Sequence, residues 1–179
     1  RSEMGEYREN IDMTYLNRNC WLEPLGSPDL NGPRHARGAF AEVLAAWENN
    51  EPAICSSHRK NYVSLEDQQV ENGYEQAAWW FETLVTRHPD IYFLTSWEVA
   101  QMYRQGASAQ LLGDHAVCRN WTDTEATVTV ALPECRQPGE LHVLTGYQLP
   151  AIELDGDQMH VMMPPGDYMI RLSASTETD

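Results

Sequence analysis

Polar side chains that can move protons or bind ligands are concentrated in residues 57–62, which read SHRKNY and follow the small apolar run PAIC at 52–55. His58 is the best candidate for chemistry, because an imidazole titrates at about pH 6.5 and suits general acid–base catalysis. Arg59 can bind a carboxylate or an oxyanion. The alternative is that His58 only caps the end of a strand by hydrogen bonding and that Arg59 pairs with a neighbouring helix.

Strand-like and helix-like segments alternate along residues 11–104 and must position these side chains. The predicted strands are 13–16, 52–57 and 91–95, and the predicted helices are 34–50, 64–89 and 96–106. Such alternation is typical of βαβ units and a parallel sheet, so we predict the α/β class for this half. Three strands are too few for a closed barrel or a well-covered open sheet, so we expect the chain to be a portion of something larger.

The carboxyl ends of parallel strands are where α/β proteins bind their ligands. The three loops that leave the predicted strands at that end are therefore expected to meet on one rim. Trp and Tyr rings beside amide and carboxylate groups suit a sugar ring, which has apolar faces and hydroxyl edges. We predict His58 as the catalytic residue. The predicted substrate-binding residues are Arg18, Asn19, Trp21, Glu23, Arg59, Asn61, Tyr62 and Trp97.

Two carboxylates on the predicted rim leave a different chemistry open. Glu23 and Glu98 could be the paired acids of a glycosidase, which requires a separation of roughly 5–10 Å. The alternative for Glu98 is a structural role in the first turn of a helix, where the helix dipole favours a carboxylate. Glu23 could likewise be a surface charge.

Short strand-like segments separated by turn signals fill the second half of the chain. The predicted strands lie within 115–122, 126–134, 139–147, 158–165 and 167–175. The segment ATVTV alternates apolar and polar side chains, so one face of its sheet is expected to meet water. We predict a small antiparallel β-sandwich over residues 114–175. A linker at 104–114 would join it to the α/β part at 1–106.

Acidic residues dominate the charge of the chain, with 27 Asp and Glu against 12 Lys and Arg and a formal net charge of −15. Nucleic-acid binding needs clustered cations, so this balance argues against it and also against anionic membranes. No apolar run approaches the roughly 20 residues of a membrane-spanning helix. We therefore predict no nucleic-acid partner and no membrane partner.

The four cysteines, Cys20, Cys55, Cys118 and Cys135, have no CxxC spacing, which argues against a zinc ribbon or a thioredoxin-like motif. Cys55 lies inside an apolar run and is expected to be a buried thiol. A bridge between Cys118 and Cys135 stays open, so cysteine usage does not fix the redox compartment.

Two stretches of the first half carry a resemblance to a known family. PAICSSHRKNY at 52–62, then a long helix, then RHPDIYFLTSWEVAQMY at 87–103 resembles the C-terminal part of polysaccharide deacetylase-like carbohydrate enzymes. LNRNCWLEP at 16–24 is similar to a preceding loop of that family, in which an Arg-Asn pair and a Glu-Pro pair recur. The resemblance covers roughly residues 13–104. The second half has no such motif. It resembles, in general character only, the accessory β-domains that often end carbohydrate-active enzymes.

The resemblance implies a distorted (β/α) barrel, of which this chain would hold the terminal βα units, and a hydrolase that removes N- or O-acetyl groups from polysaccharides. Such enzymes use a divalent metal, usually zinc, held by an Asp and two His, with a second Asp as base. Those residues lie in early TFDD-like and HxxxH-like motifs, and neither motif occurs here. His58 matches the late-strand histidine that protonates the leaving group, although the usual Leu-x-His is Ser56-Ser57-His58 in this chain.

The missing motifs leave two interpretations of the chain. Either an N-terminal part of the same protein, or another chain, completes the barrel and supplies the metal ligands, or this is a degenerate relative that cannot hold the metal. We favour the first, because an unclosed barrel exposes sheet edges and apolar faces. We expect a secreted or periplasmic location. The alternative function is a non-catalytic glycan-binding module, in which the rim aromatics and the sandwich hold a polysaccharide or oligosaccharide.

Overall fold

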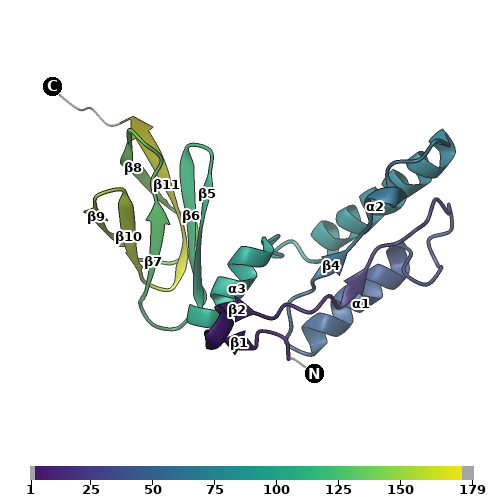
Figure 1. Ribbon diagram of the computed structural model, residues 1–179, viewed down its shortest axis with the longest axis horizontal. Helices are drawn as coiled ribbons and strands as arrows, with labels where there is room; N and C mark the ends of the chain where they lie inside the picture. The colour runs from purple at the N-terminus through teal and green to yellow at the C-terminus, as the bar shows by residue number, and fades with distance from the viewer. Residues whose placement is uncertain (1–2, 175–179) are drawn as a thin grey trace. The chain divides into compact units, whose positions relative to one another are not determined.

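The computed structural model describes residues 3–174 of the chain (Figure 1). The chain divides into two compact units, one up to Phe93 and the other from Leu94 onward. Each unit has its own hydrophobic core. The described residues contain three α-helices and several small sheets, most of them antiparallel, so the mixed α and β content of the prediction is confirmed.

The first unit contains two α-helices and very short strands. Its elements in chain order are β1 (Tyr7–Arg8), the 3-10 helix η1 (Glu9–Ile11), β2 (Met13–Thr14), β3 (Cys20–Trp21), α1 (Ala36–Glu48), β4 (Cys55–Ser56), the 3-10 helix η2 (Arg59–Asn61) and α2 (Asp67–Arg87). β1 and β2 pair antiparallel, whereas β3 and β4 pair parallel. The helices predicted at 34–50 and 64–89 are confirmed, each shortened at both ends.

Apolar side chains at helical spacing form the core of the first unit. The buried cluster consists of Cys20, Leu22, Ala36, Ala39, Phe40, Val43, Trp80 and Leu84. Its α1 members recur at intervals of three or four residues or are neighbours, which places them on one face of the helix. Leu84 is 1% exposed, and full burial of such a side chain contributes about 1.5–3 kcal/mol. The cluster therefore packs α1 and α2 against each other and against β3.

Two of the three predicted parallel strands are wrong. Residues 13–16 contribute only β2, which pairs with β1, and the strand parallel to β4 is β3, farther along the chain. Residues 91–95 form no strand, and Tyr92 and Phe93 in this segment are exposed. A strand needs a neighbouring backbone to complete its ladder of hydrogen bonds. Among residues 3–174 the one parallel pair is β3–β4, and 91–95 does not join it.

The second unit begins with α3 (Ser96–Gln105), which confirms the helix predicted at 96–106. Thr95 and Glu98 form a capping box: Thr95 Oγ1 accepts from the Glu98 amide at 3.2 Å, and Glu98 Oε2 accepts from the Thr95 amide at 2.8 Å. The helix ends at Gly106, whose φ of 69° lies in the left-handed region. A Cβ at Gly106 would approach Thr122 Cγ2 to 2.1 Å, so glycine suits this position for two reasons.

Antiparallel strands follow α3 and form two sheets. They are β5 (Ala107–Leu112), β6 (His115–Asn120), β7 (Ala126–Ala131), β8 (Arg136–Val143), β9 (Ala151–Asp155), β10 (Gln158–Met163) and β11 (Gly166–Ala174). One sheet has the order β5-β6-β11-β8 and the other the order β7-β10-β9. Two antiparallel sheets that share one core agree with the predicted β-sandwich.

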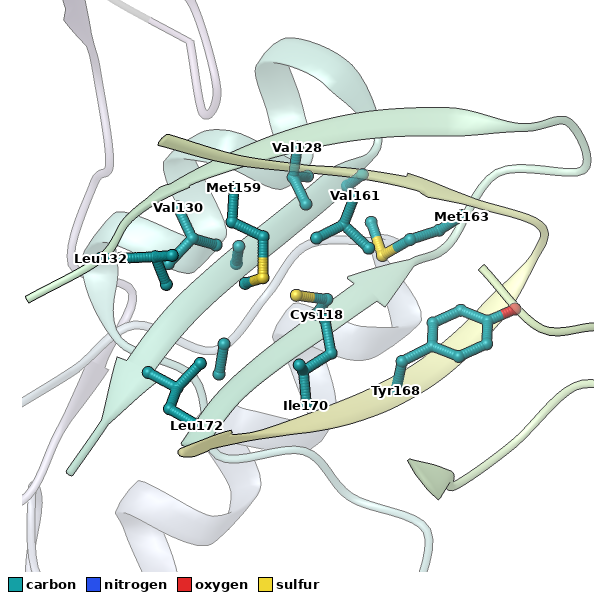
Figure 2. Packing of buried hydrophobic residues seen from close by; sticks show 13 residues of the cluster. Cys118, Val128, Val130, Leu132, Met159, Val161, Met163, Tyr168, Ile170 and Leu172 are labelled. Atoms are coloured by element: carbon teal, nitrogen blue, oxygen red, sulfur yellow. The ribbon is translucent and has the colours of Figure 1, made fainter. Parts of the chain in front are cut away.

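The core of the second unit lies between these sheets (Figure 2). In β10, Met159, Val161 and Met163 are buried while the residues between them are half-buried, which is the period of two expected for a strand. Figure 2 shows these side chains facing Cys118 of β6 and Ile170 of β11. The two sheets therefore bury complementary faces against each other.

Two strands of the second unit were not predicted from the sequence. β5 lies in the segment predicted as a linker, and β9 lies between two predicted strands. β5 reads ASAQLL and has no β-branched residue, so its strand propensity is low. β9 pairs only with β10 at the edge of its sheet and is mostly exposed, so its hydrophobic pattern is weak.

The division of the chain also differs from the predicted boundary. The predicted α/β part ended at residue 106, but α3 packs against β5 and belongs to the second unit. None of the helices within residues 3–174 combines the length and the apolar character needed to cross a membrane.

Candidate active site

The parallel pairing of β3 and β4 brings Glu23 and His58 together. Cys20 lies opposite Cys55 in this pair of strands. Glu23 lies three residues after Cys20, and His58 lies three residues after Cys55, so both leave the pair at the same end. Nδ1 of His58 lies 2.5 Å from Oε1 of Glu23. An ionised carboxylate can only accept a hydrogen bond, so Nδ1 is the protonated ring nitrogen. Two residues of the predicted rim thus form one hydrogen-bonded pair.

The Glu23 carboxylate is buried, with 6% of the residue exposed, and both of its oxygens are hydrogen-bonded. Oε1 accepts from His58, and Oε2 accepts from Asn61 Nδ2 at 2.9 Å. Burial by itself raises the pKa of Glu23, but the hydrogen bonds from Asn61 and His58 and the charges of His58 and Lys60 outweigh it and lower the pKa. Glu23 is therefore held as an anion beside the imidazole.

Asn61 is the residue that fixes this carboxylate. It lies at the end of η2, is 2% exposed, and accepts from the Leu25 amide through Oδ1 at 3.0 Å. Its Nδ2 also donates to the His58 carbonyl at 3.0 Å. The Asn61 side chain therefore connects the backbone just after Glu23, at Leu25, to the backbone of His58. Asn61 is one of the predicted substrate-binding residues, and in the structure its burial and hydrogen bonds position the Glu23 carboxylate.

Gly73 of α2 allows the helix to approach η2 closely. A Cβ at this position would lie 1.9 Å from the Asn61 carbonyl oxygen, which is backbone and cannot move aside. A glycine inside a helical pattern is often a site of close packing. The position of Asn61, and through it that of Glu23, therefore depends on a glycine in a neighbouring helix.

Two further amides of α2 hold the loop that follows Glu23. Asn72 Nδ2 donates to the Gly26 carbonyl at 2.7 Å. Gln76 donates through Nε2 to the Ser27 carbonyl at 2.5 Å and accepts from the Ala36 amide through Oε1 at 2.8 Å. Gln76 is 1% exposed, so these bonds are protected from water. They join the loop and the first turn of α1 to α2.

Tyr62 and Ser57 form a second hydrogen-bonded pair beside the first. The Ser57 hydroxyl donates to the Leu22 carbonyl at 2.5 Å, so the Tyr62 hydroxyl, 2.8 Å away, is the donor to Ser57 Oγ. Burial raises the pKa of Tyr62 and keeps the phenol protonated. The Tyr62 ring lies 5.5 Å from the Tyr74 ring, centroid to centroid, which adds an aromatic surface near the site.

The His58 side chain is 59% exposed, in contrast to its partner. Within residues 3–174, Nε2 has no protein hydrogen-bond partner, so it is the ring nitrogen that can meet a ligand. A buried carboxylate that holds Nδ1–H sets both the tautomer and the orientation of the imidazole. This arrangement can take or give one proton at Nε2.

The remaining predicted site residues of the first unit lie elsewhere. Arg59 is in η2 and is exposed. Arg18 precedes β3 and is also exposed. Asn19 lies at the amino end of the β3–β4 pair, where it accepts from the Ile54 amide at 2.7 Å. Trp21 is within β3, and the Arg34 guanidinium lies 5.2 Å from the centroid of its ring. Arg18 and Asn19 follow β2, which is not part of the parallel pair, and precede β3, so they do not lie at the carboxyl end of the parallel strands as expected.

Trp97 and Glu98 belong to the second unit. Trp97 is 60% exposed, and Glu98 is 1% exposed. Besides its part in the capping box, Glu98 accepts from Arg119 Nη1 at 2.6 Å. Its carboxylate is committed to the start of α3 and to this ion pair, which matches the structural alternative considered for it.

The donor set at the site does not fit the zinc centre that the resemblance implies. One imidazole and one carboxylate are present, and they hydrogen-bond to each other, whereas a catalytic zinc takes three protein ligands. In residues 3–174 no group of three or more His, Cys, Asp and Glu side chains is arranged to hold a metal ion.

Several residues that support the pair and the loop beside it were not predicted from the sequence. Ser57, Gly73 and Gln76 were not predicted, although a glycine in the middle of a helical pattern was a signal for close packing. Gln76 gave no such signal, because nothing in the sequence distinguishes a buried glutamine from an exposed one.

Comparison of the chain with protein-family models found no match, and a search among curated proteins found none either.

Proposed function

We propose that the chain is a portion of a carbohydrate-active hydrolase that deacetylates a polysaccharide, with His58 as the general acid. The observation that carries this proposal is the hydrogen bond between buried, anionic Glu23 and exposed His58. The substrate class rests on the resemblance of residues 13–104 to polysaccharide deacetylase-like enzymes.

In the proposed reaction, protonated His58 donates the proton on Nε2 to the nitrogen or oxygen that leaves as the acetyl group is cleaved. Glu23 supports this step by holding the ring through Nδ1–H, so that Nε2 points in one direction. Asn61 keeps the carboxylate in position by occupying its second oxygen.

The proposal also includes a partner. The rest of the barrel would come from an N-terminal part of the same protein or from another chain, and would bring the metal ligands that the described residues do not provide. The proposed activity therefore belongs to the assembled enzyme. No step of it passes through a metal held by this chain.

The test is acetate release from acetylated oligosaccharides by the complete enzyme that contains this chain. His58→Ala is expected to lower kcat by at least about 10²-fold, the usual contribution of a general acid. Near-normal turnover by this variant would contradict the proposal. Oligosaccharide binding by the wild type without any turnover would favour a glycan-binding module instead.

His115→Ala is the matched control. His115 lies 3.1 Å from Asp114 through Nδ1, so it is also a histidine beside a carboxylate, but it lies in the second unit and its partner Asp114 is exposed. This variant is expected to keep its turnover. A fall in kcat equal to that of His58→Ala would mean that loss of a histidine–carboxylate pair acts through the fold and not through proton transfer.

A further inference from the structure

Two cysteines face each other across the parallel pair that positions the candidate site. Cys20 of β3 and Cys55 of β4 are partners in the strand register. Neighbouring strands lie about 4.7–4.9 Å apart, and disulfides usually join Cα atoms about 4.4–6.8 Å apart. The two residues are therefore placed at a separation that a disulfide can span. Both are free thiols in this structure.

The two thiols have different surroundings. Cys20 is fully buried, and its Sγ lies 3.3 Å from the Ala39 carbonyl oxygen. Cys55 is exposed, which corrects the prediction that it is a buried thiol. The β4 strand is only two residues long, so it is not covered on both faces as a strand in a larger parallel sheet would be.

The thiols also affect each other electrostatically. Their hydrogen bond lowers the pKa of Cys55 and, together with burial, raises the pKa of Cys20. Of the two thiols, Cys55 therefore loses its proton more readily than Cys20. An accessible thiolate beside a protonated second thiol is the arrangement that favours attack on an external disulfide.

We propose that Cys20 and Cys55 form a redox-active dithiol that is oxidised to a disulfide by low-molecular-weight disulfides such as oxidised glutathione. Cys55 attacks one sulfur of the small disulfide, forms a mixed disulfide and releases one small thiolate. Cys20 then attacks Cys55 Sγ, which releases the second small thiolate, and the Cys20 proton passes to one of the two released thiolates. In total two protein thiols are oxidised and one small disulfide is reduced.

The location of the pair gives the modification a structural consequence. Glu23 and His58 lie three residues after Cys20 and Cys55, respectively. A covalent link between β3 and β4 would fix the register of the two strands on which the Glu23–His58 hydrogen bond depends. The inference concerns the thiols themselves and is independent of the proposed hydrolase activity.

The test is incubation of the folded chain with oxidised glutathione, followed by alkylation of the remaining thiols and peptide mass spectrometry without reduction. The expected product is a Cys20–Cys55 crosslinked peptide with little glutathione left on Cys55. Cys135, which is exposed and has no cysteine as a strand partner, serves as the internal control and is expected to retain glutathione. Cys118 is buried and is expected to stay unmodified until the chain unfolds.

A stable glutathione adduct on Cys55, at the level seen on Cys135, would overturn the proposal, as would a crosslink that involves Cys118 or Cys135. Cys20→Ser provides a second measurement. It is expected to trap the mixed disulfide on Cys55, because the resolving thiol is gone. If the serine variant does not fold, the peptides of the oxidised wild type still decide between a Cys20–Cys55 disulfide and a glutathione adduct on Cys55.

Discussion

The two units of the molecule fix their backbones in different ways. In the second unit, strands of five to nine residues pair in antiparallel ladders and bury one apolar core between them. In the first unit each strand has only two residues, and the structure depends on buried polar side chains that bond to backbone groups.

Amide side chains take the place of the missing ladders in the first unit. Asn19 bonds the backbone of 52–54 to the start of β3, and Asn61 bonds Leu25 to η2. Gln76 bonds the loop before α1 to α2. Buried backbone groups must be paired, and where no second strand supplies the partner a side chain has to. One of these amides, Asn61, also holds the Glu23–His58 pair.

The largest effect that this comparison predicts is in the apolar core of the second unit. Ile170→Ala removes a side chain that is fully buried between the sheets and leaves a cavity. We expect the free energy of unfolding of this unit to fall by about 2–5 kcal/mol. Urea denaturation, followed by hydrogen exchange read peptide by peptide, measures the loss and assigns it to a unit.

Leu154→Ala is the control for this prediction. Leu154 is also an aliphatic strand residue of the second unit, but it is 55% exposed in β9. We expect a change within about 0.5 kcal/mol. Equal losses in the two variants would mean that the core between the sheets does not carry the stability of this unit.

The next effect is in the buried amides of the first unit. Gln76→Leu keeps a side chain of similar size but leaves the Ala36 amide and the Ser27 carbonyl without their partner. We expect the first unit to lose about 1–3 kcal/mol, the cost of unpaired buried polar groups. Hydrogen exchange should increase in peptides that cover residues 24–36 and α2, and remain unchanged in the β-strands of the second unit.

Glu75→Leu places the same new side chain at the preceding position of α2, where the native residue is exposed. It is expected to change stability by no more than about 0.5 kcal/mol. If Gln76→Leu were as stable as this control, the view that amide hydrogen bonds replace strand ladders would be wrong.

The smallest effect is the pH dependence of the first unit, because the burial penalty of Glu23 offsets part of its hydrogen bonding. The pKa of Glu23 in the folded state is below its ordinary value of 4.5. Its stabilising contribution is therefore fully present above about pH 4.5 and is lost as the pH falls through the folded pKa. Glu23→Gln cannot titrate, so the unfolding free energy of the first unit should fall less steeply on acidification.

Urea denaturation at several pH values between about 3 and 7 measures this difference. Glu48→Gln, at the exposed end of α1, is the matched control and should keep the wild-type pH profile. A Glu23→Gln variant with the same acid dependence as the wild type would show that the carboxylate is not held as an anion by Asn61 and His58.

Elements with a strong local signal were predictable. The spacing of apolar residues located α1 and α2, and the alternation in ATVTV located β7. Strands that depend on a partner were not predictable in this way. The apolar run 91–95 has the composition of a buried strand yet forms no strand in the structure, and ASAQLL has a poor strand composition yet pairs with β6. In both cases the neighbouring backbone decided the outcome: β5 pairs with β6 across the turn between Leu112 and His115, whereas 91–95 joins none of the sheets of the described residues.

For the site, the sequence by itself determined the chemistry that is available: an imidazole at the end of an apolar run, a glutamate in another loop, and an excess of negative charge. Only the tertiary structure decided which groups act together. It selected Glu23 as the partner of His58, gave Asn61 a positioning role, and set Cys20 opposite Cys55. The physical reason is that the pairing depends on strand register, which joins residues 35 positions apart, and on the close packing of α2 against η2 at Gly73.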